Sequence, residues 1–262
     1  MINIIVLRNL KNQGDTGDFM DNEKKTDQVP EDLNKIIMGR KFDCPVCKGN
    51  FENWDVASYK VRIAKSDTDL RNYFVPFDPL YYAVVICPLC GYSAQRSDFS
   101  GIQPKQAQLI LEKITTQFTP KDYPQVYTVD MAIERYKHAL ECALVKEGKT
   151  SEIAMIYLRL SWLYRDKEDT VSETVYREYA LKGLIEAFEA ERFPIAGMDS
   201  ATLDYLIGEL HRRSGNLDEA TKHIGKVIVL KGIPSRLKER ALDVKELILK
   251  EKAESEDGEG KN

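Results

Sequence analysis

Four of the five cysteines form two matched pairs whose residue types and spacing suit metal chemistry. Each pair has the sequence CPxC, first in CPVCKG and then in CPLCGY. Two thiolates from one tight turn can take two corners of a tetrahedral metal site, and a second such turn can supply the other two. The spacing therefore predicts one four-thiolate site, built by Cys44, Cys47, Cys87 and Cys90.

Structural zinc is the metal that we expect at this site. Gly91, and less closely Lys48-Gly49, permit a tight turn in which backbone amides face the sulfurs. A segment of about 60 residues buries little surface, and zinc would stabilise it. Iron in a rubredoxin-like setting is the less favoured alternative, because CPLCGY also suits that fold. A redox dithiol is also disfavoured, since it usually stands alone at the start of a helix.

Length, charge and hydropathy limit the class of protein. The 262 residues carry a net charge of −4, which argues against a surface that binds phosphate backbones all over. The early apolar run INIIVL is too short to cross a membrane, and no small-residue cleavage site follows it. Paired CPxC cysteines suit a reducing compartment better than a disulfide framework. We therefore expect a cytoplasmic protein without a membrane segment.

The carboxy-terminal half resembles tetratricopeptide repeats (TPRs), in which pairs of antiparallel helices stack side by side. The best match is ATLDYLIGELHRRSGNLDEATKHIGKV, where Gly208 would let the second helix approach and Gly215 would end the first. A small–large–small pattern typical of the second helix occurs three times, at Ala132, Tyr136 and Ala139, at Ala180, Leu184 and Ala187, and at Ala220, Ile224 and Val227. The copies start 48 and 40 residues apart, against roughly 34 in the family, so the repeats are stretched and diverged.

Composition divides the chain into four parts, which together predict an α+β, multi-domain protein. They are a flexible lead at 1–39, a four-cysteine zinc-ribbon-like β module at 40–100, an all-α TPR-like domain at 101–251 and a disordered acidic tail at 252–262. In the lead, Met20 is an alternative start of translation. The module should contain strands within 57–64 and 80–86. Helices are expected from about Gln103 and then at 127–147, 151–167, 173–191, 199–213, 217–230 and 235–251.

TPR stacks present a concave surface to a peptide or partner helix, and the first helix of each pair faces the groove. By that resemblance, the partner-binding side chains would be Trp162 and Arg165 in one pair, and Tyr205, Glu209, Arg212 and Arg213 in the last. The arginines indicate an acidic or carboxylate-bearing protein partner. A solvated helix face explains the same residues without a partner.

A nucleic-acid-associated regulator that uses the ribbon is the alternative function. Between Arg40 and Phe99 there are eight basic and seven acidic residues, fewer basic ones than a nucleic-acid ribbon should have. The many aromatic residues of this segment could stack on bases, but they serve equally as the core of a small metal module. Lys60, Arg62 and Lys65 could form a small basic patch.

No catalytic constellation is recognisable. His138 and Cys142 lie four residues apart on one predicted helix and could touch. They fall within the repeat-like pattern, where Cys142 more simply packs as a small hydrophobic side chain. The chain also lacks a glycine-rich phosphate loop and an HExxH motif. We therefore expect a protein that is not an enzyme.

The order of these motifs resembles an uncharacterised bacterial family, known mainly as a domain-of-unknown-function family. The resemblance rests on two CPxC knuckles, the strand YKVR between them, the segment PLYY…ICPLCGYSA and the TPR-like helices that follow. It implies a bacterial, cytoplasmic, metal-binding protein and transfers no activity. We therefore expect a zinc-binding, non-enzymatic interaction or scaffold protein.

Overall fold

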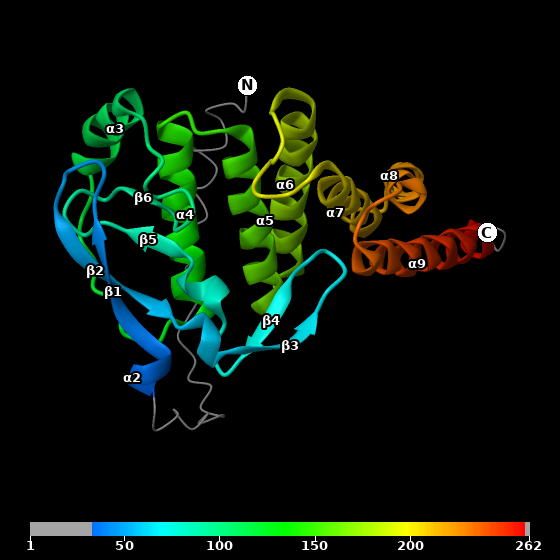
Figure 1. Cartoon of the computed structure of the whole chain (residues 1–262), viewed down its shortest axis with the longest axis horizontal. Helices are drawn as coiled ribbons and strands as arrows, with labels where there is room; N and C mark the ends of the chain where they lie inside the picture. Colours follow the sequence, from blue (N-terminus) through cyan, green and yellow to red (C-terminus); the bar gives the residue numbers. More distant parts are fainter. Residues whose placement is uncertain (1–32, 260–262) are drawn as a thin grey trace.

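The computed structural model describes residues 33–259, with side chains as far as Ser255. It is an α+β protein, mostly helical, with three short antiparallel hairpins (Figure 1). The strands pair as β1 (Ile37–Asp43) with β2 (Asn50–Val56), β3 (Arg62–Ser66) with β4 (Asn72–Val75) and β5 (Val84–Ile86) with β6 (Ser93–Gln95). The helices are α2 (Leu33–Ile36), α3 (Pro104–Ile110), α4 (Val129–Val145), α5 (Thr150–Asp166), α6 (Thr170–Ala190), α7 (Ser200–Arg213), α8 (Leu217–Val229) and α9 (Ser235–Glu259).

The predictions for the flexible lead as far as residue 32, for a start at Met20 and for the last three residues lie outside the described residues. Within the described chain, the lead gives way to α2 and β1, so residues 33–39 are part of the folded protein. At the other end, α9 continues from the predicted limit of 251 to Glu259. Among residues 33–259, no helix has the length and apolar character that crossing a lipid bilayer requires.

Helices α4 to α9 form where the sequence predicts them, because local signals mark their ends. At the start of α4, the hydroxyl of Thr128 accepts a hydrogen bond from the Met131 amide, and Asp199 caps α7 in the same way. After α7, Gly215 adopts a φ of +78°, a left-handed conformation that ends the helix and lets α8 begin at once. The predicted helical segments are therefore confirmed.

Neighbouring helices approach closely where a residue lacks a bulky side chain. A β-carbon at Gly208 of α7 would lie 2.9 Å from the Ile224 side chain of α8. At the contact between α5 and α6, a β-carbon at Gly183 would lie 2.8 Å from that of Ala154. Ser161 of α5 donates its hydroxyl to Leu158 O, in the preceding helical turn.

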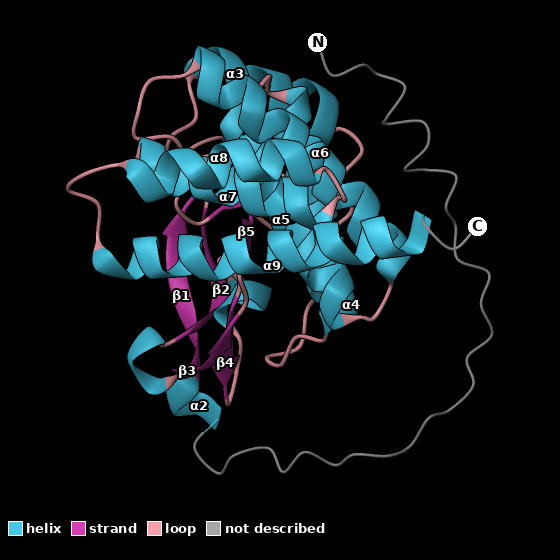
Figure 2. Cartoon of the chain, turned by 90° about the vertical axis from the view of Figure 1, so that its right-hand side faces the viewer, coloured by secondary structure: helices cyan, strands magenta, loops and turns pink. Residues whose placement is uncertain are grey.

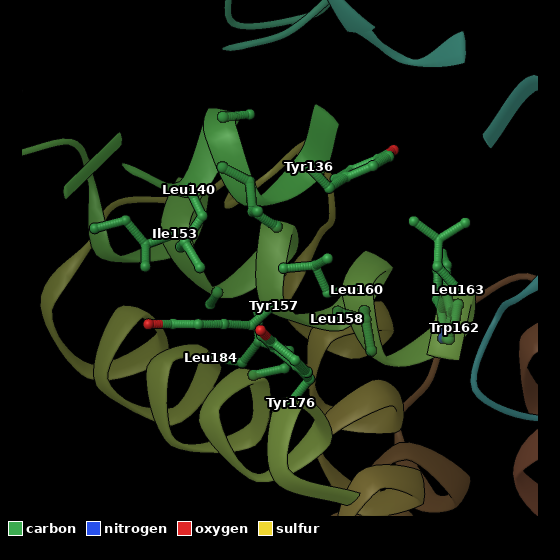
Figure 3. Close-up of a cluster of buried hydrophobic side chains, with 14 of the residues drawn as sticks. Tyr136, Leu140, Ile153, Tyr157, Leu158, Leu160, Trp162, Leu163, Tyr176 and Leu184 are labelled. Atoms are coloured by element: carbon green, nitrogen blue, oxygen red, sulfur yellow. The ribbon is translucent and has the colours of Figure 1, made fainter. Parts of the chain in front are cut away.

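The main hydrophobic core lies between α4, α5, α6 and α7. Figure 3 shows its centre, with Tyr136 and Leu140 of α4, Tyr157 and Leu160 of α5 and Leu184 of α6, all of which are buried. Burial of each large apolar side chain contributes roughly 1.5–3 kcal/mol. This core therefore supplies most of the stability of the helical part.

Side chains of the hairpins pack in the same hydrophobic cores as side chains of the helices. These cores therefore contain residues from both sides of residue 100. Val84 and Ile86 of β5 belong to the main core between the helices. Three of the paired cysteines pack in a second core with Ile110 and Ile114, which follow residue 100, and with Cys142 of α4. The segment with the cysteines and the first helices therefore depend on each other for burial.

Hairpin β3–β4 reaches along the helices and places its turn, residues 67–71, beside α5, α7 and α9 (Figures 1 and 2). The strand predicted at 57–64 begins only at Arg62, after a 3-10 turn, and β3 is exposed on both faces. The strand predicted at 80–86 shortens to β5. Pro79 fixes a helical φ and the Asp78 carboxylate accepts a hydrogen bond from the Leu80 amide, so residues 79–82 form a 3-10 turn.

Candidate metal centre

The two CPxC segments form turns of the same design, each at the tip of a hairpin. Between β1 and β2, the Cys44 amide donates to Gly49 O at 2.9 Å, and the Lys48 amide donates to Cys44 O at 2.9 Å. Between β5 and β6, the corresponding bonds run from the Cys87 amide to Tyr92 O and from the Gly91 amide to Cys87 O, both at 2.9 Å. Each turn closes through one left-handed residue, Lys48 with a φ of 63° and Gly91 with a φ of 77°.

The turns bring all four predicted ligands together. The Sγ atoms of Cys44 and Cys90 are 3.6 Å apart, those of Cys47 and Cys87 are 3.7 Å apart, and all four lie within 4.8 Å of one another. Zinc with Zn–S bonds of about 2.3 Å at the centre of a regular tetrahedron would hold sulfurs about 3.8 Å apart. The four cysteines could therefore hold a metal ion, and their spacing fits one of zinc's size.

Burial and mutual hydrogen bonding set the acid–base behaviour of the thiols. Cys44, Cys87 and Cys90 are at most 1% exposed, and Cys47 is half-buried. Hydrogen bonds from Cys87 and Cys90 lower the pKa of Cys44 to about 2. The same interaction with Cys44 raises the pKa of Cys87 to about 12 and raises that of Cys90. Without a cation, the cluster therefore favours a Cys44 thiolate held by the thiols of Cys87 and Cys90, whereas a metal would require these two thiols to ionise.

Helix α4 and the segment before it hold the second turn from behind. Nε2 of His138 donates to Gly91 O at 2.7 Å, and the Thr115 hydroxyl donates to Cys90 O at 2.7 Å. The Phe118 ring packs directly on Gly91, where a β-carbon would lie 2.4 Å from a ring carbon. These contacts fix the position of Cys87 and Cys90 relative to the helices.

His138 and Cys142, the pair considered as a nucleophile and base, both use the carbonyl of Gly91. The Cys142 thiol donates to that oxygen at 3.6 Å, beside the shorter bond from His138. Cys142 is fully buried, and burial raises its pKa to about 12. A thiol in this state is protonated and inaccessible, so its contacts favour a packing role.

The six predicted partner-binding residues gather around the turn of hairpin β3–β4, residues 67–71. Trp162 Nε1 donates to the Asp69 carboxylate at 3.0 Å, and Arg165 donates to the same carboxylate at 2.6 Å. Tyr205 donates its hydroxyl to Thr68 O at 2.6 Å. Asp69 is fully buried. We call the surface formed by the six residues the turn-binding groove; they are Trp162, Arg165, Tyr205, Glu209, Arg212 and Arg213.

Glutamate and arginine side chains complete the turn-binding groove. The Thr68 hydroxyl donates to the Glu209 carboxylate and accepts a bond of 3.1 Å from Arg213. Arg212 and Arg213 each donate to Glu209 at 2.7 Å, and Arg212 also pairs with Glu251 of α9. The structure thus brings all six residues together, and a segment of the same chain covers them.

The sequence did not identify the turn as the occupant of this groove. The signal was present, because DTDLR offers two carboxylates and a hydroxyl, and the arginines already indicated an acidic ligand. What was missing was the course of the hairpin, which carries Asp69 to a residue 96 positions further along the chain. That path depends on tertiary packing and leaves no periodic pattern.

Comparison with known proteins identifies a family. A family model described as an uncharacterised protein conserved in bacteria (DUF2225) matches residues 37–248. No curated protein and no solved structure matches the chain. The matched region begins in β1 and ends in α9, so it includes the four clustered cysteines and helices α3 to α8. The chain therefore belongs to the DUF2225 family of bacterial proteins.

Proposed function

We propose that this protein is a zinc-binding, non-enzymatic interaction protein. A structural four-thiolate zinc site fixes the first and third hairpins onto the helices. The TPR-like helices bind an acidic segment of a protein partner in the turn-binding groove. The observation that carries the proposal is that the turn-binding groove already binds an acidic turn of the same chain, residues 67–71.

Two properties of the cysteine cluster support a structural role for zinc. Four thiolates close the coordination shell of a tetrahedral ion, and a catalytic site keeps one position open for water or substrate. Three of the four sulfur-bearing residues are also buried beneath the helices. The matching hydrogen bonds of the two turns at the hairpin tips support their assignment as a pair of metal-binding turns.

Elemental analysis of the purified full chain tests the metal. We expect about one zinc per chain, and loss of that zinc in Cys44→Ser because three thiolates hold the ion less well. Cys142→Ser is the matched control, since Cys142 is a buried cysteine whose hydroxyl replacement can still donate to Gly91 O. One iron per chain would instead support the rubredoxin-like alternative, and no metal in a freshly purified protein would contradict both.

The contacts that the turn-binding groove already makes with the chain's own acidic turn support an acidic partner. Two aspartates meet Arg165, with Nη1 to Asp67 at 2.9 Å and Nη2 to Asp69 at 2.6 Å. A hydroxyl between them bonds with Glu209. A partner segment with the same spacing of carboxylates and hydroxyl would compete with the turn. The groove opens when hairpin β3–β4, whose β3 strand is exposed on both faces, moves aside.

A peptide of residues 64–74 tests the groove in trans. We predict that it binds a full-length Asp67→Asn, Asp69→Asn variant, in which the chain's own turn has lost its carboxylates. Binding to the wild-type protein should be at least about tenfold weaker, because the tethered turn has a high effective concentration. Fluorescence anisotropy of the labelled peptide measures both affinities.

Two controls make that experiment specific. The same peptide with both aspartates changed to asparagine should not bind, and adding Arg165→Ala to the host should abolish binding of the acidic peptide. Equal binding of the acidic and neutral peptides would contradict the groove as an acidic-segment site. Failure of the acidic peptide to bind the full-length Asp67→Asn, Asp69→Asn variant would also contradict it.

A nucleic-acid role is the second candidate, and the exposed segment from the 3-10 turn at Ser58–Lys60 into β3 is the feature that favours it. Tyr59, 78% exposed, lies next to Lys60 and close in sequence to Arg62, so an aromatic ring and cations are available on one exposed segment. The other aromatic residues of residues 40–100 are buried, as Phe51, Tyr82, Tyr92 and Phe99 are, or partly buried. Binding of single-stranded RNA that weakens steeply with salt and is lost in Tyr59→Ala would favour this function.

A further inference from the structure

Arg135 of α4 is a buried cation whose contacts in the described structure are all with uncharged groups. Its side chain is 2% exposed and lies among the largest fully buried side chains. Its Nη2 donates to Asn53 Oδ1 at 2.7 Å and to Val84 O at 2.8 Å. The guanidinium also lies 4.7 Å from the ring centroids of both Tyr123 and Tyr127. These contacts position the guanidinium, and none of them carries a full negative charge.

The hydrogen-bonding capacity of Arg135 is not exhausted. Its Nε is buried and has no acceptor within the described part of the chain. No carboxylate of residues 33–255 lies within ion-pair distance of the guanidinium; neighbouring Glu134 pairs with Lys121 at 2.6 Å. Burial lowers the pKa of Arg135, which reflects the cost of a charge without a counter-ion. Removing a cation from water without pairing it is strongly unfavourable, so such a group is a functional candidate.

A cavity adjoins this arginine. It has a volume of about 730 Å³ and lies between hairpin β1–β2, the segment before α4 and α4 itself. Arg135 and His138 line it from α4, and Trp54, Phe118 and Tyr123 contribute aromatic walls. The volume is in the range of pockets that hold small organic ligands. Thus a largely buried cation, aromatic surface and a half-open cavity meet in one place.

We propose that this cavity binds a small organic anion, whose carboxylate or phosphate group pairs with Arg135 and whose apolar body packs between the aromatic walls. The other charged residues of the lining balance one another, since three lysines face four carboxylates and Lys121 pairs with Glu134, so the pairing rests on Arg135. Because Nη2 is already bound to Asn53 and Val84, the guanidinium is held in place before the ligand arrives. Preorganisation of this kind favours tight pairing. The cavity is separate from the turn-binding groove; its wall includes Pro88 of the second cysteine turn but none of the four cysteines.

The two tryptophans of the chain make the proposal directly testable. Trp54 lines the cavity and Trp162 lies in the turn-binding groove. In a full-length, zinc-loaded Trp162→Phe protein, fluorescence therefore reports on the cavity alone. Benzoate and phenyl phosphate are the anionic probes, and benzyl alcohol is the neutral probe of similar shape. We expect a saturable change in Trp54 fluorescence with at least one anion and binding about tenfold weaker or more with benzyl alcohol.

Substitutions then locate the anion. Arg135→Gln should weaken anion binding about tenfold or more while leaving the response to benzyl alcohol unchanged. Gln117→Phe, which adds a ring at the exposed rim without altering Arg135, should weaken both probes. Arg192→Gln removes an exposed charge outside the cavity and should change neither. Zinc content and thermal unfolding verify that each variant is folded.

The outcomes separate the possible ligands and can overturn the proposal. Binding of benzoate alone assigns a carboxylate, and binding of phenyl phosphate alone assigns a phosphate. The proposal is wrong if neither anion binds the folded protein at millimolar concentration, or if benzyl alcohol binds as tightly as the anions. If Arg135→Gln is unfolded, equal anion binding by wild type and a folded Gln117→Phe variant overturns it instead. None of these results bears on the zinc site or on the acidic peptide.

Discussion

Lys48 and Gly91 occupy the same place in the two cysteine turns, yet only one of them is a glycine. Both are left-handed, and both follow the second cysteine of their pair directly. Lys48 tolerates this conformation at an energetic cost because its side chain extends into solvent, where it donates to Pro45 O. Gly91 has no such freedom, since the Phe118 ring fills the space where a β-carbon would lie. The residue that directly follows each cysteine pair, a lysine or a glycine, therefore distinguishes the exposed turn from the covered one.

This difference predicts unequal effects of alanine at two glycines. Gly91→Ala combines a strained φ with overlap on Phe118 and should lower the free energy of unfolding by about 2–3 kcal/mol. At Gly49, a β-carbon would overlap the end of Leu89, which is 61% exposed and can move, and would lie at ordinary van der Waals distance, 3.5 Å, from Cys47 Sγ. Gly49→Ala should therefore cost less than about 1 kcal/mol.

Chemical denaturation of both zinc-loaded variants measures that difference. If Gly49→Ala proved as destabilising as Gly91→Ala, the packing of Phe118 on the second turn would not be what distinguishes them. The four cysteines themselves could be predicted from spacing alone. Thr115, Phe118 and His138, which hold the second turn, could not, because no local motif links them to it.

At the scale of elements, the helices could be predicted well and the strands only in part. Helices α4 to α9 have apolar residues at helical spacing and sharp end signals such as Gly215, so local information was sufficient. Residues 57–64 alternate like a half-buried strand, but β3 projects from the molecule and Ile63 is 48% exposed. Alternation therefore indicated an extended segment correctly and its burial incorrectly. The docking of residues 67–71 had a chemical signal in its two aspartates, but no pattern in the sequence showed where the turn would lie.

Docking of the β3–β4 turn should depend on pH through Asp69. Burial raises the pKa of this carboxyl, but the hydrogen bond from Arg165 and the charges of Arg213 and Arg165 outweigh it, so the pKa is lowered overall. A lowered pKa means that the ionised form stabilises the fold above the ordinary value near 3.8, and that this contribution is lost as pH falls through the folded pKa. Asp69→Asn should therefore cost about 3 kcal/mol at neutral pH.

The expected pH dependence is a difference between wild type and Asp69→Asn that is constant above about pH 5 and shrinks as the solution is made more acidic. Urea denaturation at a series of pH values measures it. Asp218→Asn is the control, because Asp218 is exposed and its ion pair with Lys252 lies at the surface, where it should contribute nothing measurable. A difference for Asp69→Asn that stayed the same from neutral to acid pH would show that its charge does not hold the turn.

In the whole molecule, composition suggested a domain boundary at residue 100. Two hydrophobic cores nevertheless contain residues from both sides of that boundary. The second core contains cysteines from both turns together with side chains of α3 and α4. The third hairpin also contributes Val84 and Ile86 to the main core between the helices. Metal binding at the cysteines should therefore stabilise helices as well as hairpins, since ligand binding to the folded state stabilises everything that folds with it.

Removal of zinc should lower the thermal stability of the entire described fold. We predict that a strong chelator shifts the helical unfolding transition, followed by far-ultraviolet circular dichroism, down by at least about 10 °C, because structural zinc contributes several kcal/mol. Added zinc should restore it. A helical transition unaffected by chelation, in a protein shown to have lost its metal, would mean that the helices fold independently of the site.

X-ray absorption spectroscopy at the zinc edge of the purified full chain tests the central claim, the four-thiolate zinc site, most directly. The Sγ positions of Cys44, Cys47, Cys87 and Cys90 predict four sulfur ligands at about 2.3 Å and no oxygen or nitrogen in the first shell. Cys142→Ser should leave that spectrum unchanged. A shell with fewer than four sulfurs, or one completed by water or imidazole, would contradict the closed structural site on which this account of the protein depends.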